Sequence, residues 1–133
     1  MGINRGEIYF VRLDPTLGRE MGGDKSRPVM ILSINDINRK PLVVTVVPGT
    51  SAGTKRTYYR NIVLVAPSKE NGLAVDTLFQ CHQVRAIDHA RFTAGPVGRL
   101  SAEDLRRIEG AIRYNLGLVD DGAVASSSPQ PAP

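Results

Sequence analysis

Cysteine and aromatic residues are scarce in this sequence of 133 residues, which has one cysteine, no tryptophan and 5% aromatic residues. Because Cys81 is alone, no disulfide can form within the chain, in agreement with a reducing cytoplasm. No cationic start followed by an apolar run precedes Gly6, so no secretory signal is visible. The longest apolar runs, 28–32 and 42–48, are far too short to cross a bilayer. We therefore expect a cytoplasmic protein that does not act in a membrane.

The common catalytic motifs are also missing. The sequence contains no phosphate-binding Walker loop, no G-x-S-x-G nucleophile turn and no H-E-x-x-H metal motif. Cys81 and His82 are adjacent, and neighbours on a strand point to opposite faces, which argues against a shared metal ion. His89 has no partner at a metal-ligand spacing. We therefore expect neither a metal ion nor another cofactor.

Positive charge exceeds negative charge in this chain. Overall, 17 Lys and Arg residues oppose 13 Asp and Glu residues, which gives a formal charge of +4. Two of those acids lie after Leu118, where there is no Lys or Arg, so residues 1–118 carry 17 basic against 11 acidic side chains, or +6. A basic domain attracts polyanions such as nucleic acids, although many soluble proteins are modestly basic without binding them.

The length fits a single domain, which we place at residues 1–118. Strands are predicted where β-branched or apolar residues cluster between turn signals, at 7–13, 28–34, 41–47, 61–66 and 76–87. Residues 14–26 hold three glycines and five charged residues and are predicted to form a long surface loop. Residues 119–133 cannot bury enough apolar surface to offset their ordering entropy, so we expect a disordered tail.

One helix is predicted near the end of the domain. Ser101 can cap it, and Asp104 stands three residues later at the capping-box spacing. Apolar residues then recur at helical spacing, at Leu105, Ile108, Ile112 and Leu116. Gly117 is the expected stop. The sequence thus predicts a mainly β fold (α+β by helix content), a compact barrel or curled sheet with a C-terminal helix.

The chemistry that remains is that of arginine, hydroxyl groups and one histidine. RNA carries its own nucleophile, the 2′-hydroxyl, so a protein can cleave it without a metal ion by stabilising the crowded phosphorane and moving two protons. Arg27 follows the glycine-rich loop and precedes a buried strand, which would place its fork where a mobile segment meets a rigid one. The alternative is a surface arginine at the start of a strand.

Two further polar segments could serve the same chemistry. Thr50 and Ser51 follow an apolar run and could hold a phosphate or position the 2′-hydroxyl, or they could form an ordinary turn. Basic and aromatic side chains are mixed in the next segment, at Lys55, Arg56, Tyr58, Tyr59 and Arg60. This pattern suits contact with an RNA backbone together with base stacking. It also suits a solvated hairpin edge.

Taken together, these segments resemble the MazF/PemK family of bacterial toxin–antitoxin modules. The resemblance runs through the segments 5–9, 13–16, 26–33, 47–51, 83–88, 98–100 and 115–118, together with Gly18, Glu20, Gly22 and Gly23. Each motif alone is weak, but their number, order and spacing cover residues 5 to 118.

The family implies an SH3-like β-barrel with a C-terminal helix that works as a homodimer. It also implies metal-independent, sequence-specific cleavage of single-stranded RNA, with mRNA as the expected target. The products would end in a 2′,3′-cyclic phosphate and a 5′-hydroxyl, and the cleavage would inhibit translation and growth. A cognate antitoxin would cover the RNA groove with an acidic disordered segment.

The resemblance also assigns roles to residues. The residues that match Arg27 and Thr50 are the catalytic pair in similar members, where the arginine stabilises the phosphorane or acts as general acid and the threonine positions the nucleophile or the phosphate. Where some members carry an Arg and an Asp two residues apart, or a Glu at the second place, this chain has Gln80 and His82. His82 could supply the missing acid or base, or it could be a packed or interface histidine. We expect RNA contacts from Glu20, Lys25, Ser51, Lys55, Arg56, Gln80 and Arg85.

Two alternatives belong to other functional classes. CcdB-type toxins share the fold and poison DNA gyrase without cutting nucleic acid, but they end in an exposed tail that contains tryptophan, and this chain has none. A catalytically inactive RNA-binding barrel is the second alternative, and the presence of Arg27 and Thr50 argues against it.

Overall fold

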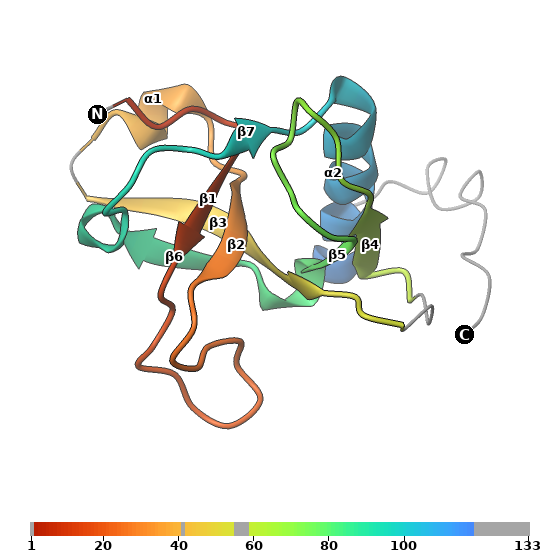
Figure 1. Ribbon diagram of the computed structural model, residues 1–133. Coiled ribbons are helices and arrows are strands. Elements are labelled where there is room, and N and C mark those ends of the chain that lie inside the picture. The colour runs from red at the N-terminus through yellow and green to blue at the C-terminus, as the bar shows by residue number, and fades with distance from the viewer. Residues whose placement is uncertain (1, 41, 55–58, 119–133) are drawn as a thin grey trace.

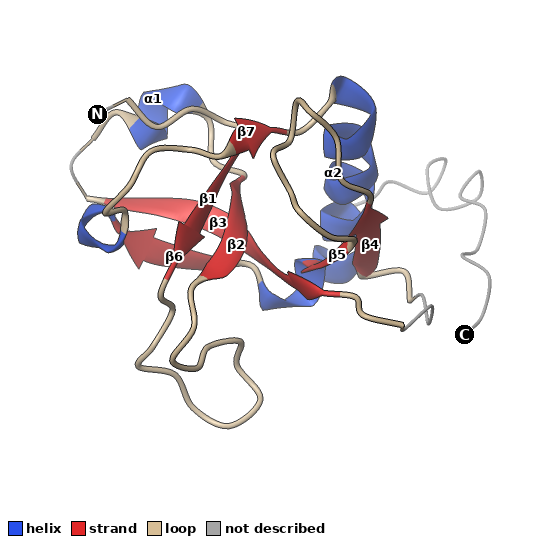
Figure 2. Ribbon diagram, in the orientation of Figure 1, coloured by secondary structure: helices blue, strands red, loops and turns tan. Residues whose placement is uncertain are grey.

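The computed structural model describes residues 2–40, 42–54 and 59–118. The strands are β1 (Glu7–Val11), β2 (Arg27–Ile31), β3 (Val43–Ser51), β4 (Ile62–Val65), β5 (Thr77–Gln80), β6 (Arg85–Asp88) and β7 (Gly98–Arg99). The helical elements are α1 (Asn35–Asn38), the 3₁₀ turns η1 (Cys81–Gln83) and η2 (His89–Arg91), and α2 (Ala102–Leu116) (Figure 2). A mainly β fold with one long C-terminal helix is therefore confirmed, whereas the predicted tail at 119–133 lies outside the described residues.

The strands form one curled antiparallel sheet in the order β4-β5-β3-β2-β1-β7, with β6 paired to β3 (Figure 1). The nine-residue strand β3 is its centre, because it pairs with β2 along one edge and with β6 and then β5 along the other. Four of its first five residues are valines, whose branched side chains suit a pleated surface covered on both sides. β4 and β7 stand at the two ends of the strand order, as in a half-barrel.

The single strand predicted at 76–87 is wrong in its middle. β5 and β6 both run along β3, but Gly49 is opposite Phe79 while Val46, three residues earlier, is opposite Arg85, six residues later. The three extra residues form the turn η1. Gln80 and His82 therefore do not share one face of a strand, and the argument from opposite strand faces does not apply to Cys81 and His82.

Apolar side chains form a cluster on each face of the sheet. The first cluster lies under α2 and comprises Ile8, Met30, Val47, Val63, Val65, Leu73, Phe79, Cys81, Leu100, Ile108, Ala111 and Ile112. The second lies on the other face and comprises Ile3, Tyr9, Val11, Leu13, Val29, Ile31, Val44, Val46, Ile87 and Phe92. Burial on both faces explains why the strand sequences are nearly continuous apolar runs.

Helix α2 begins and ends as its sequence predicts. The hydroxyl of Ser101 accepts a hydrogen bond from the backbone N–H of Asp104 at 3.1 Å, and Gly117 ends the helix with a left-handed φ of 68°. Ile108 and Ile112 are buried in the first cluster. Leu116 departs from the predicted apolar face, since its side chain is 52% exposed.

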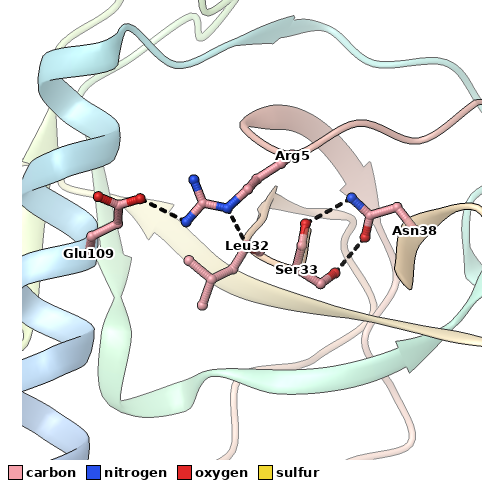
Figure 3. A network of polar contacts seen from close by, with 5 residues as sticks. All are labelled: Arg5, Leu32, Ser33, Asn38 and Glu109. Carbon is pink, nitrogen blue, oxygen red and sulfur yellow. Dashed lines mark hydrogen bonds and ion pairs between the residues drawn. The ribbon is translucent and has the colours of Figure 1, made fainter. Parts of the chain in front are cut away.

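A polar network joins the start of the chain to α2 (Figure 3). The Arg5 Nε donates to the Leu32 carbonyl at 2.8 Å, and its Nη2 forms an ion pair with Glu109 on α2 at 2.8 Å. Beside it, the buried Asn38 side chain donates to the carbonyl of Ser33 at 2.8 Å, which holds the short helix α1 against the exit of β2. The network fixes the segment before β1, the end of β2 and α2 relative to one another.

Candidate catalytic site

Arg27, the first residue of β2, is held by two hydrogen bonds. Its Nη1 donates to the Thr50 hydroxyl at 3.0 Å, and its Nε donates to the carbonyl of Gly22 at 3.0 Å. The side chain is half-buried, so the guanidinium is oriented on one side by a strand and on the other by the loop that precedes it. This arrangement fixes the plane of the guanidinium group.

The pairing of β2 with β3 explains why Arg27 and Thr50 meet. Val29 lies opposite Pro48 in this antiparallel pair, and two residues further Arg27 therefore faces Thr50. Thr50 and Ser51 are not in a turn after the strand, as the sequence suggested, because β3 continues through both and pairs there with β5. The pair thus lies on regular strands, which hold side chains more firmly than a loop does.

The loop between β1 and β2 projects from the sheet (Figure 1) and is closed on itself by Asp14. The Asp14 Oδ1 accepts from the backbone N–H of Gly23 at 2.9 Å and from the Thr16 hydroxyl at 2.8 Å. The bond from Gly23 and then the bond from Thr16 hold the pKa of Asp14 below its usual range. A side chain at Gly22 would collide with the side chains of Asp14 and Thr16, which would have to move and give up their present contacts.

Side chains of residues 83–91 hold the same loop. The Arg85 Nη1 donates to the carbonyl of Leu13 at 3.2 Å, and the Arg91 Nη1 donates to the carbonyls of Arg12 and Asp14 at 2.8 and 2.6 Å. The Gln83 amide bonds the loop backbone at two points, accepting from the N–H of Met21 at 2.8 Å and donating to the carbonyl of Arg19 at 2.9 Å. The loop is therefore long but anchored.

The charge of Arg27 is not neutralised by a neighbour. Between described residues the ion pairs are Arg5 with Glu109 and Arg107 with Asp104, and neither involves Arg27. A guanidinium held by a hydroxyl and a carbonyl keeps its full positive charge and a rigid fork, which suits an oxyanion or a phosphate.

The other predicted site residues are spread over neighbouring segments. His82 is exposed in η1, and Gln80 is half-buried at the end of β5. Ser51 and Lys25 are exposed. The Glu20 carboxylate accepts from the backbone N–H of Leu17 at 2.7 Å, which closes the tip of the loop. Lys55, Arg56 and Tyr58 lie outside the described residues.

Tyr59 and Arg60, which follow Tyr58, are described. Arg60 lies over the ring of Tyr114 on α2, with 4.6 Å from its guanidinium carbon to the ring centroid. Tyr59 is 52% exposed. The cation–π contact ties the entrance of β4 to the C-terminal half of α2.

Sequence reasoning missed Gln83, Asp14 and Arg91 as parts of the site. Asp14 offered a local signal, because an aspartate at the start of a glycine-rich loop commonly accepts hydrogen bonds from the following backbone. Gln83 and Arg91 bond atoms more than sixty residues away in the chain, and no local pattern reports such contacts.

Neither a metal centre nor a membrane span is found in residues 2–40, 42–54 and 59–118. No group of three His, Cys, Asp or Glu side chains there could hold a metal ion. Burial raises the pKa of the Cys81 thiol to about 12, so it stays protonated at neutral pH and is a poor ligand or nucleophile. No helix in these ranges is long and apolar enough to cross a bilayer.

The fold and the site define a small curled-sheet protein with one C-terminal helix, in which an uncompensated arginine and a threonine meet beside an anchored loop. Residues 4–116 match the family described as "PemK-like, MazF-like toxin of type II toxin-antitoxin system". The chain therefore belongs to the PemK/MazF toxin family, as its motifs suggested.

Relatives agree with this membership, and solved structures share the fold. Endoribonuclease MazF9 of Mycobacterium tuberculosis is 35% identical over 121 residues, covering 87% of this chain and 98% of the relative. Endoribonuclease EndoA of Bacillus subtilis is 29% identical over 120 residues, covering 90% and 99%. The structure of MazF from Deinococcus radiodurans superposes with a TM-score of 0.72 at 23% identity over 88% of this chain and 98% of that chain. An endoribonuclease in complex with its cognate antitoxin, from mycobacterial species, gives a TM-score of 0.68 at 22% identity over 88% and 97%.

Proposed function

We propose that this chain is the toxin of a toxin–antitoxin module and a metal-independent endoribonuclease that cleaves single-stranded RNA, with mRNA as its main target. The observation that carries the proposal is the Arg27 guanidinium, which is fixed by Thr50 and Gly22 and has no carboxylate partner in the described residues. The names of the relatives support the activity.

The reaction uses the nucleophile that RNA brings. The 2′-oxygen attacks the adjacent phosphorus as its proton is removed, the bond from phosphorus to the 5′-oxygen breaks, and the leaving 5′-oxygen takes a proton. The products end in a 2′,3′-cyclic phosphate and a 5′-hydroxyl. Arg27 stabilises the charge on the phosphorane or donates the proton, and Thr50 positions the phosphate or the 2′-hydroxyl.

His82 is the proposed acid or base that relatives supply with a carboxylate. It is exposed in η1, one residue before Gln83, whose side chain contacts the loop beside Arg27. Lys25, Ser51, Gln80 and Arg85, with Glu20 on the loop and with Lys55 and Arg56, are the proposed RNA contacts. One N–H group of Arg85 donates to the Leu13 carbonyl, so Arg85 would contact RNA through its remaining N–H groups.

The proposed partners are a second copy of this chain and a cognate antitoxin. The net charge of +4 suits an acidic disordered antitoxin segment that competes with RNA for the same groove. A similar solved structure that contains a cognate antitoxin supports this partner.

The test is incubation of the purified protein with a long RNA in EDTA, followed by mapping of the 5′ ends. Cleavage at a repeated short motif that leaves 5′-hydroxyl ends is the expected result. Intact RNA together with inhibition of gyrase would instead indicate a gyrase poison, and intact RNA with tight binding would indicate an inactive RNA-binding protein.

A further inference from the structure

One peptide group of the loop is hydrogen-bonded both to Arg27 and to Asp14. It joins Gly22 to Gly23, and its carbonyl accepts from the Arg27 Nε at 3.0 Å while its N–H donates to the Asp14 carboxylate at 2.9 Å. A carboxylate at one end and a guanidinium at the other polarise the same peptide in the same direction, and hydrogen bonds that polarise one another strengthen one another. The orientation of this peptide therefore sets the position of one of the two groups that hold the guanidinium.

The Gln83 side chain holds the backbone just before that peptide. Its carbonyl oxygen accepts from Met21 N–H at 2.8 Å, and its amide nitrogen donates to the Arg19 carbonyl at 2.9 Å. These two backbone groups flank residue 20, so the side-chain amide pairs with the loop as a neighbouring strand would. An amide alone can both donate and accept here, and neither a carboxylate nor an apolar side chain of the same length can do both.

Of the two groups that hold Arg27, the Thr50 hydroxyl and the Gly22 carbonyl, only the second depends on the loop. Thr50 stands on β3, whose pairing with β2 and β5 does not involve the loop. Gly22 belongs to the loop. Arg85 and Arg91 hold the start of that loop, at residues 12–14, whereas Asp14 from within and Gln83 from η1 hold the stretch around Gly22. Loss of either of these two nearer anchors should loosen the Gly22 carbonyl and with it one of the two supports of the guanidinium.

We propose that Gln83 and Asp14 are positioning residues, which fix the Gly22–Gly23 peptide group and through it the orientation of the Arg27 guanidinium. Their contribution to cleavage rests on the proposed function. Neither residue touches RNA in this account, because both act through the backbone of the loop.

The test measures the Arg27 Nε–H directly by NMR, with exchange against solvent as the readout. The variants are Gln83→Met, which keeps the length of the side chain and removes both bonds, and Asp14→Ala. Each lost anchor should raise the exchange rate of the Arg27 Nε–H about tenfold, since the hydrogen bonds that it loses set the population of the open loop. Arg27→Lys assigns the signal by removing it.

Arg5 supplies a matched internal control. Its Nε also donates to a backbone carbonyl, that of Leu32 at 2.8 Å, and no contact of Arg5 involves the loop. Its exchange should be unchanged in both variants. If the two arginines respond alike, the variants have loosened the whole domain, and if the Arg27 signal does not respond, the anchors do not orient it. Either result overturns the proposal.

Cleavage gives the second readout. For an RNA with a mapped cleavage site, Gln83→Met should lower the single-turnover rate about tenfold. Its affinity for the same RNA with a 2′-deoxy nucleotide at that site should change less than about twofold. Equal losses in rate and affinity would mean that Gln83 supports RNA binding rather than the orientation of Arg27. Gln83→Glu, which keeps the acceptor only, should fall between Gln83→Met and the parent chain. If the parent chain cleaves no RNA, the proposed function fails, while the exchange measurement still decides whether the anchors orient Arg27.

Discussion

Arg5 and Arg27 are held in the same way and yet differ in the group that faces their charge. Each donates from Nε to a backbone carbonyl, Leu32 for the first and Gly22 for the second, and each uses a second nitrogen on a side chain. For Arg5 that side chain is the Glu109 carboxylate, whereas for Arg27 it is the Thr50 hydroxyl.

The difference separates a structural arginine from one suited to chemistry. The charge of Arg5 is paired with that of Glu109, and this ion pair links the segment before β1 to α2 (Figure 3). The charge of Arg27 has no such partner in the described residues, so a phosphate would meet it undiminished. A rigid guanidinium without a charged partner lowers the stability of the unliganded chain, and it stabilises the complex when an anion binds.

The largest expected effect is that of replacing Arg27. Arg27→Ala should lower the single-turnover rate of RNA cleavage about a thousandfold, because the side chain proposed to stabilise the phosphorane is lost. Arg5→Ala should leave the rate within about twofold and lower the free energy of unfolding by about 1 kcal/mol, as expected for a partly exposed ion pair. Cleavage and thermal unfolding of both variants, measured side by side, check this contrast. It breaks down if Arg27→Ala stays active or if Arg5→Ala loses activity while folded.

Replacement of His82 should have the next largest effect. If His82 is the acid or base, as proposed, His82→Ala should lower the cleavage rate about a hundredfold at saturating RNA. Circular dichroism should be unchanged, because the side chain is exposed. A rate equal to that of the parent chain would remove His82 from the mechanism and leave Arg27 to act without it.

A smaller effect is expected for the hydroxyl that faces Arg27. Thr50→Val keeps the shape of the side chain and removes the acceptor, so cleavage should slow about 10- to 100-fold, which is the range for a hydrogen bond to a charged group. Thr50→Ser keeps the hydroxyl and should recover most of the activity. Equal rates for the two variants would mean that the methyl group rather than the hydroxyl of Thr50 matters.

The smallest expected effect concerns pH and the loop. The pKa of Asp14 is lower in the folded chain than its ordinary value, so its contribution to stability is present above that value and is lost as the pH falls through the folded pKa. The urea concentration at the midpoint of unfolding should therefore decrease when the pH is lowered below about 4. The decrease should be smaller in Asp14→Asn, whose oxygen still accepts from Gly23 but does not titrate. Parallel curves for the two proteins would exclude Asp14 as a source of the acid dependence.

The elements that the sequence could predict are those whose signals lie within one segment of the chain. The cap at Ser101, the apolar spacing at Ile108 and Ile112 and the stop at Gly117 are all within one helix, and α2 has these bounds. The break at η1 depends on a three-residue slip between β5 and β6 along β3, and no residue of that segment signals it.

The meeting of two residues of the candidate site was predictable in the same limited sense. The family motif identified Arg27 and Thr50, and the pairing of β2 with β3 brings them together. The hydrogen bonds from Gln83 and Arg91 to the loop were not predictable, because they join segments that only the folded sheet brings near. For Lys55 and Arg56 the sequence prediction stands alone, since they lie outside the described residues.

The most direct test of the central claim is a titration of the two arginine side chains with RNA that cannot be cut. An oligonucleotide with a mapped site and a 2′-deoxy nucleotide at the cleavage position lacks only the nucleophile, so it should occupy the site intact. In ¹⁵N–¹H spectra the guanidinium signals of Arg27 should shift and saturate with the binding curve, while those of Arg5 stay in place. Saturated binding with no change at Arg27 would contradict the claim that its charge meets the phosphate.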